Sequence, residues 1–188
     1  KATYENHGTM AAVFTSEKEK LEMLCDDVTS KVGLVKIANY NCKTQYVISG
    51  VNNAVDEVIE RKEEAFIKKF IKLKVSGAFH TPLMNSAALG IEEELKKIKH
   101  NNFHTPVIMN CDAKYLKIEE LPLKMKMQVE SSVYFEDSIK KLIDDKFDLF
   151  VEIGPGQVLK NLVKKIDENV ETVSINSLED IEKLRGIL

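Results

Sequence analysis

One histidine stands where acid-base chemistry is plausible. The stretch VSGAFHTPLM, residues 75–84, places His80 between an alternating apolar segment and a helix start. Thr81 and Pro82 suit the first positions of a helix, because the hydroxyl caps free N–H groups and proline has no N–H to lose. The positive end of the helix dipole favours a neutral imidazole that can accept a proton. His80 is the first candidate for a general base, although a histidine that simply caps or packs is the commoner case.

A second candidate is the segment EIGPGQVL, residues 152–159. Gly154 and Gly156 allow a tight turn after a strand, and the helix that follows offers free N–H groups to an anion. The signal is weak, since neither a GKS or GKT continuation nor a GxGxxG pattern is present. A plain strand-to-helix turn explains it as well. Asn39 and Asn41 offer amides to a ligand, but asparagines are also common in turns.

The partners that a histidine base needs are missing from this sequence. No GxSxG nucleophile elbow occurs, and the two arginines, Arg61 and Arg185, are distant in sequence from His80. A clamp for a substrate carboxylate is therefore expected outside this chain. The three cysteines, Cys25, Cys42 and Cys111, show no CxxC spacing, so we expect reduced, half-buried thiols and neither a disulfide framework nor a zinc site.

Composition excludes several functional classes. With 188 residues, 44% of them apolar and 30% charged, the chain can bury a sizeable core. A net charge of −3 argues against a nucleic-acid partner, which needs a basic surplus. No apolar run is long enough to cross a membrane, and KATYENHGTM does not read as a signal peptide. We expect a soluble cytoplasmic protein whose sequence begins within a longer one.

The first part of the chain predicts a split βαβ arrangement. Strands are expected at 10–14, 34–38, 45–49 and 71–75, with a polar turn at 39–44. Helices are expected between the first and second and between the third and fourth of these strands. The order βαββαβ over residues 10–75 is typical of a ferredoxin-like fold, with four antiparallel strands and two helices on one face.

The second part follows a different pattern. A helix is expected from Thr81 to about Lys99, with others near 119–128 and 135–145, and short apolar strands at VIMN, DLFVEI and ETVSI. One more helix is expected after the GPG loop, with the apolar residues Leu159, Leu162, Val163 and Ile166. Helices alternating with such strands indicate a parallel α/β sheet covered on both faces. Three buried strands make a poor sheet alone, so we expect the remaining strands elsewhere.

Six segments together resemble a known family. GTMAAV, ANYNCKTQYVISG, VSGAFHTPLM, VIMNCDAK, QVESSVYF and VEIGPGQVLKNLVKKI occur in the order and at about the spacing found in malonyl-CoA:acyl carrier protein transacylases. The similarity runs from about residue 8 to residue 176. It implies a ferredoxin-like subdomain, 10–75, inserted into a larger α/β-hydrolase-like domain whose C-terminal part is 76–188. Residues 1–9 are then a connector from an upstream segment.

The resemblance implies a role for each site residue. His80 is similar to the family's catalytic histidine, which activates a serine, protonates the departing coenzyme A thiolate and deprotonates the incoming pantetheine thiol. Gln128 resembles the residue whose backbone carbonyl orients that ring, and Asn41 a pocket asparagine. Phe79 belongs to an AFH segment that accompanies malonyl specificity in related domains. Its ring would exclude an α-methyl branch, although one methylene is worth only about 1 to 3 kcal/mol.

The implied reaction is ping-pong transfer of a malonyl group from coenzyme A to acyl carrier protein, in fatty acid or polyketide synthesis. Malonyl-CoA is a substrate, and no metal or other cofactor is implied. The family's glutamine loop with its oxyanion donor, its GHSLGE-type elbow and its carboxylate-binding arginine should precede Lys1. We therefore expect this chain alone to be inactive, with a complementary N-terminal segment or chain as a partner. Ser132 and Gln157 depart from the proline and lysine common in relatives.

Two other hypotheses remain at this point. The chain could be a non-catalytic module that binds acyl carrier protein, or a hydrolase using a cysteine with His80, which lacks a recognisable nucleophile elbow. A lysine-rich helix surface could receive an acidic carrier protein, or be an ordinary solvated face. It comprises Lys140, Lys141, Lys160, Lys164 and Lys165.

Overall fold

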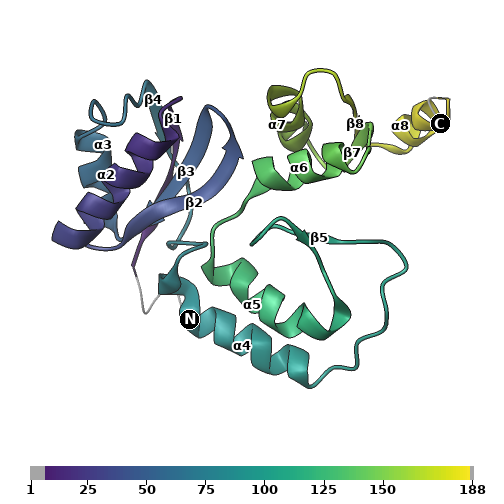
Figure 1. The fold of residues 1–188 in the computed structure, drawn as a ribbon, viewed down its shortest axis with the longest axis horizontal. Helices are drawn as coiled ribbons and strands as arrows, with labels where there is room; N and C mark the ends of the chain where they lie inside the picture. The colour runs from purple at the N-terminus through teal and green to yellow at the C-terminus, as the bar shows by residue number, and fades with distance from the viewer. Residues whose placement is uncertain (1–6, 187–188) are drawn as a thin grey trace. The chain divides into compact units, whose positions relative to one another are not determined.

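The computed structural model describes residues 7–186 (Figure 1). Two compact units divide within one helix, the first ending at Ser138 and the second beginning at Ile139. The predicted connector, residues 1–9, lies mostly outside the described residues, and Thr9 already belongs to the first strand. The predicted boundary between residues 75 and 76 falls inside the first unit.

The first unit is built on a four-stranded antiparallel sheet. Its strands are paired in the order β2-β3-β1-β4. Along the chain the elements are β1 (Thr9–Phe14), α2 (Lys18–Lys31), β2 (Val35–Cys42), β3 (Gln45–Gly50), α3 (Asn52–Glu60) and β4 (Lys69–Lys72). The βαββαβ order predicted for this part of the chain is therefore present.

Helical periodicity explains the core of this sheet. In α2 the apolar residues recur at intervals of three and four, so Leu21, Leu24 and Val28 fall on one buried stripe. They pack with alternate residues of the strands, such as Val13 and Ile48, in one cluster. Figure 1 shows α2 and α3 on the same face of the sheet.

Two strand boundaries differ from the sequence prediction. The polar stretch 39–44 was expected to be a turn, but β2 continues to Cys42 and only residues 43 and 44 turn. The strand continues because Cys42 is buried and Tyr40 packs against the core. The fourth strand was expected over residues 71–75 and half-buried, yet β4 ends at Lys72 and all its residues are exposed. β1 itself extends further, to Thr9, and the Leu73 N–H still donates to the Met10 carbonyl at 2.9 Å.

A helical hairpin follows the sheet within the same unit. A 3-10 turn (Pro82–Met84) leads into α4 (Asn85–Lys96), and a second 3-10 turn (Ile118–Glu120) leads into α5 (Leu121–Glu130), which packs beside α4 (Figure 1). Between them β5 (Ile108–Met109) pairs antiparallel with β6 (Lys114–Tyr115). The expectation that VIMN joins a parallel sheet was therefore wrong for the described residues. The chain reverses at 110–113, where the Ala113 N–H donates to the Met109 carbonyl.

The second unit contains one parallel strand pair. Its elements are the end of α6 (Phe135–Asp144), β7 (Leu149–Ile153), α7 (Val158–Ile166), β8 (Glu171–Ile175) and α8 (Leu178–Arg185), and β7 pairs with β8. The sequence analysis predicted all of these except α8. Ile153 is 81% exposed and Val158 67% exposed, which is unusual for parallel strands and their covering helices.

Candidate active site

His80 is held in an uncommon backbone conformation. Its φ angle is +61°, in the left-handed region that few residues other than glycine adopt. The His80 N–H donates to the Val129 carbonyl at 3.2 Å, and the next residue, Thr81, caps the 3-10 turn that follows. The Thr81 hydroxyl accepts from the Leu83 N–H and donates to the Ala78 carbonyl, as a cap should. The cap expected from the sequence is confirmed.

The imidazole makes a defined hydrogen bond to the end of α5. Its Nδ1 lies 2.9 Å from the backbone carbonyl oxygen of Gln128. A carbonyl can only accept, so a neutral ring must carry its proton on Nδ1 and leave Nε2 as the acceptor. This is the orientation that a general base requires.

Burial sets the protonation state of this ring. His80 is half-buried, and desolvation lowers the pKa of its imidazole below the ordinary value, while the nearby carbonyls of Gln128 and Ser131 oppose the shift in part. The imidazole is therefore neutral at pH 7. A neutral ring with one free nitrogen can take a proton from a hydroxyl or thiol and return it.

Residues after α5 hold the carbonyl of Gln128 in place. The Val133 N–H donates to the Ala38 carbonyl at 2.8 Å, and the Tyr40 N–H donates to the Val133 carbonyl at 2.9 Å, so this segment pairs with β2. The buried Ser132 hydroxyl donates to the Ile37 carbonyl at 2.7 Å. A proline at position 132 would lack this bond, which tethers the segment after α5 to the sheet.

Asn41 and Phe79 lie on elements next to this arrangement. Asn41 is half-buried at a register shift of β2, between Tyr40 and Cys42. Bulges of this kind redirect side chains and are frequent near active sites. Phe79 packs against buried residues on the sheet face opposite α2 and α3. The structure places both near the sheet that anchors the His80 segment, and their contacts with a substrate remain predictions.

The cysteines are poor nucleophiles. Cys25, Cys42 and Cys111 are each at most 4% exposed. Burial raises the pKa of the Cys25 thiol to about 12, and burial also raises that of Cys111. Since the thiolate is the reactive form, a hydrolase mechanism using one of these cysteines is disfavoured.

Side chains of the chain itself already bond the N–H groups in and after the glycine-containing loop. The carboxylate of Glu152, from the end of β7, accepts from the N–H groups of Leu159 and Lys160 at 3.1 and 2.9 Å. The Gly156 N–H donates to the Asn176 side chain at 2.7 Å. The Glu152 carboxylate therefore already binds the free N–H groups in the first turn of α7. This favours a plain strand-to-helix turn over a phosphate-binding loop.

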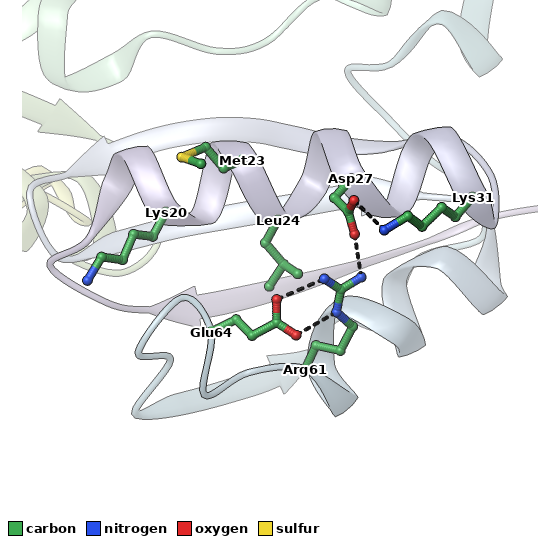
Figure 2. Close-up of a pocket in the computed structure, with 7 residues that line it drawn as sticks. All are labelled: Lys20, Met23, Leu24, Asp27, Lys31, Arg61 and Glu64. Atoms are coloured by element: carbon green, nitrogen blue, oxygen red, sulfur yellow. Dashed lines mark hydrogen bonds and ion pairs between the residues drawn. The ribbon is translucent and has the colours of Figure 1, made fainter.

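Arg61 is likewise engaged. Arg61 lines a hollow of about 380 Å³ beside α2. Its guanidinium bonds both oxygens of Glu64 and one oxygen of Asp27, each at 2.8 Å, and Figure 2 draws these bonds as dashed lines. Asp27 also pairs with Lys31 at 2.6 Å. These ion pairs raise the pKa of Arg61 and lower those of both carboxyls. Arg61 joins α2 to the turn after α3 and does not serve as a carboxylate clamp.

Backbone groups at this site escaped the residue-by-residue reading of the sequence. The carbonyls of Gln128, Val129 and Ser131 act on His80 whatever their side chains are, so no residue type signals them. Only the resemblance indicated position 128. Among residues 7–186 no group of three or more His, Cys, Asp or Glu could hold a metal ion, and none of the helices described there could span a membrane.

Comparisons with known proteins all identify acyl transferases as similar to this chain. A family model described as the acyl transferase domain matches residues 1–180. The malonyl CoA-acyl carrier protein transacylase of Bacillus subtilis is 40% identical over 177 residues, covering 93% of this chain and 56% of that protein. The crystal structure of MCAT from Streptococcus pneumoniae superposes with a TM-score of 0.92 at 34% identity, covering 100% of this chain and 61% of that one.

A transacylase structure from Clostridium perfringens gives a TM-score of 0.90 at 33% identity, over 96% of this chain and 57% of that one. This chain thus spans less than two thirds of each of these relatives.

Proposed function

Because the chain belongs to the acyl transferase domain family, we propose that it is the C-terminal part of a malonyl-CoA:acyl carrier protein transacylase. In this proposal the longer protein moves a malonyl group from coenzyme A to the pantetheine thiol of acyl carrier protein, in the cytoplasm. The observation that carries it is the hydrogen bond between His80 Nδ1 and the Gln128 carbonyl. That bond leaves Nε2 of a neutral ring free for proton transfer.

His80 acts twice in the proposed mechanism. It first accepts the proton of a serine hydroxyl as the oxygen attacks the malonyl thioester, and then gives that proton to the departing coenzyme A thiolate. In the second half it accepts the proton of the pantetheine thiol, which displaces the serine oxygen, and returns the proton to that oxygen. The first half replaces the thioester bond by an ester bond to serine, and the second half replaces that ester by a new thioester. Neither half oxidises or reduces anything, and no metal or cofactor is needed. The serine lies outside this chain.

The remaining roles follow from position. Gln128 orients the ring through its backbone carbonyl, Asn41 lines the acyl pocket from the bulge of β2, and Phe79 limits the pocket beside His80 so that malonyl is preferred. Residues 10–75, the four-stranded sheet with its two helices, are a ferredoxin-like subdomain. Residues 76–188 are the C-terminal part of an α/β-hydrolase-like domain. The exposed residues of β7 and α7, including Ile153 and Val158, are then covered by a complementary N-terminal segment.

Substitution of the base tests this proposal. We expect His80→Asn, in the chain extended upstream by about 120 residues, to lower malonyl transfer by about 10² to 10⁴-fold. Asparagine tolerates the left-handed backbone of this position better than most residues, so the fold should persist. Transfer at the parent rate would overturn the role of His80. Binding of carrier protein with no transfer by the extended chain would instead favour the non-catalytic module.

A further inference from the structure

The strand β4 leaves one edge of the sheet open. Its neighbour on one side is β1, and the described residues contain no strand on its other side. Phe70 lies opposite Val13, on the helix face, and is 40% exposed; Ile71 lies opposite Ala12, on the other face, and is 45% exposed. Apolar side chains are thus exposed on both faces of the same edge.

The charge of this segment has one sign. Residues 65–80 contain four lysines and no acidic residue. Lys72 pairs with Asp56, and the Lys69 ammonium lies 5.7 Å from the centre of the Phe14 ring. Lys68 and Lys74 are exposed and have no side-chain partner among the described residues. Lysines often protect an open edge from aggregation, and here Phe70 and Ile71 add exposed apolar surface to the same edge.

The lysines on α6 and α7 offer a weaker surface than the sequence suggested. Lys141 bonds both oxygens of Asp145 at 2.6 Å. Lys164 donates to the carbonyls of Glu168 and Val170 at 3.0 and 2.7 Å. These ammonium groups already have partners within their own unit, so a docking protein would have to displace them.

The β4 edge also lies near the candidate base. His80 follows Lys74 by six positions, a span of at most about 20 Å. Leu73 and Phe79, which flank this interval, pack against the same buried cluster of Met10, Ala12, Ala38 and Val47. The residues next to the open edge and next to the histidine therefore pack on the same face of the sheet in the first unit.

We propose that the β4 edge, defined by Lys68, Phe70, Ile71 and Lys74, is the surface on which the acidic carrier protein docks. The inference rests on the proposed function, which supplies the carrier as a partner. Positive charge draws the acidic partner to this edge, and the exposed apolar side chains provide the contact area. Docking there brings the tip of the pantetheine arm toward His80.

Charge reversal tests the docking surface. We expect the double variant K68E/K74E, in the chain extended upstream, to raise the KM for carrier protein by on the order of tenfold, more at low than at high salt. Malonyl loading from malonyl-CoA should keep its parent rate and KM. The matched control K140E/K160E reverses two charges on the other lysine surface and should change the carrier KM little.

Each other outcome has a definite meaning. An unchanged carrier KM in K68E/K74E, or a larger change in K140E/K160E, overturns the docking surface. A raised KM for malonyl-CoA instead of carrier protein assigns the lysines to coenzyme A phosphates and also overturns it. Should the extended chain transfer no malonyl at all, the proposed function fails. Carrier binding by the same variants, measured by calorimetry, then still decides whether the β4 edge is a docking surface.

Discussion

The two units differ in how far each completes its own structure. The four-stranded sheet buries Leu21, Val13 and Ile48 completely and forms one continuous core with its two helices. The β7–β8 pair instead leaves Ile153 and Val158 largely exposed. Antiparallel strands joined by short connections can fold with one covered face, whereas parallel strands normally need cover on both faces.

This difference bears on where the chemistry is organised. The base, the carbonyl that orients it and the tether of that carbonyl to β2 all belong to the first unit. The geometry around His80 therefore needs nothing from the second unit. The nucleophile and the cover for β7 are the parts that we assign to an upstream segment.

The largest expected effect compares one core residue from each unit. Leu21→Ala should lower the free energy of unfolding of the first unit by about 2 to 5 kcal/mol, since it leaves a cavity under the sheet. Ile153→Ala should cost less than about 0.5 kcal/mol in this chain, because that side chain is 81% exposed. Urea unfolding monitored by far-UV circular dichroism, which needs no tryptophan, measures both free-energy changes.

The same pair of variants sharpens the comparison in the extended chain. If an upstream segment covers β7, Ile153→Ala should there cost about 2 kcal/mol or more. An equally small cost in both lengths of chain would contradict the proposed cover.

The second prediction concerns pH and isolates the first unit. The folded-state pKa of His80 is lowered, so protonation favours the unfolded chain, in which histidine titrates near 6.5. The contribution of the neutral His80 ring to the free energy of unfolding is fully present above about pH 6.5. It is lost as the pH falls toward the folded-state pKa. An NMR titration of this chain alone should place the His80 midpoint below about 6.5.

Activity should follow the same group. In the extended chain kcat/KM should fall up to about tenfold per pH unit below the His80 pKa, because the protonated ring cannot act as a base. Comparing urea unfolding of the parent and His80→Asn chains at several pH values separates this contribution from other titrations. A midpoint above 6.5 would contradict the burial described here.

The third prediction tests the loop of the second unit. Glu152→Ala removes the acceptor for two N–H groups at the start of α7 and should cost about 1 kcal/mol of stability. Glu152→Gln keeps one acceptor oxygen and should recover part of the loss. Glu171→Ala, an exposed change on β8, is the matched control and should have little effect. Equal effects of E152A and E171A would show that the cap contributes nothing.

The smallest effect is expected at Gln128. The contact with His80 uses the backbone carbonyl, so Gln128→Ala should leave the His80 titration midpoint and malonyl transfer near their parent values. A large loss of transfer with an unchanged fold would show that the side chain itself takes part.

The sequence predicted local order well wherever side-chain periodicity carries it. The stripe of Leu21, Leu24 and Val28 located α2, and Thr81 located the turn after His80. It failed where pairing partners decide the outcome: β4 ends at Lys72, before the predicted end at residue 75, and the strand within VIMN pairs with β6 across the turn at 110–113. The carbonyls around His80 could not be found from residue types, because every residue has one.

Intact-mass measurement of malonyl loading tests the central claim most directly. This chain and the chain extended upstream by about 120 residues would each be mixed with malonyl-CoA. The account predicts one malonyl group on the extended chain, little on its His80→Asn variant, and none on the short chain. Loading of the short chain would reveal a nucleophile within these residues and contradict the proposed division between base and nucleophile.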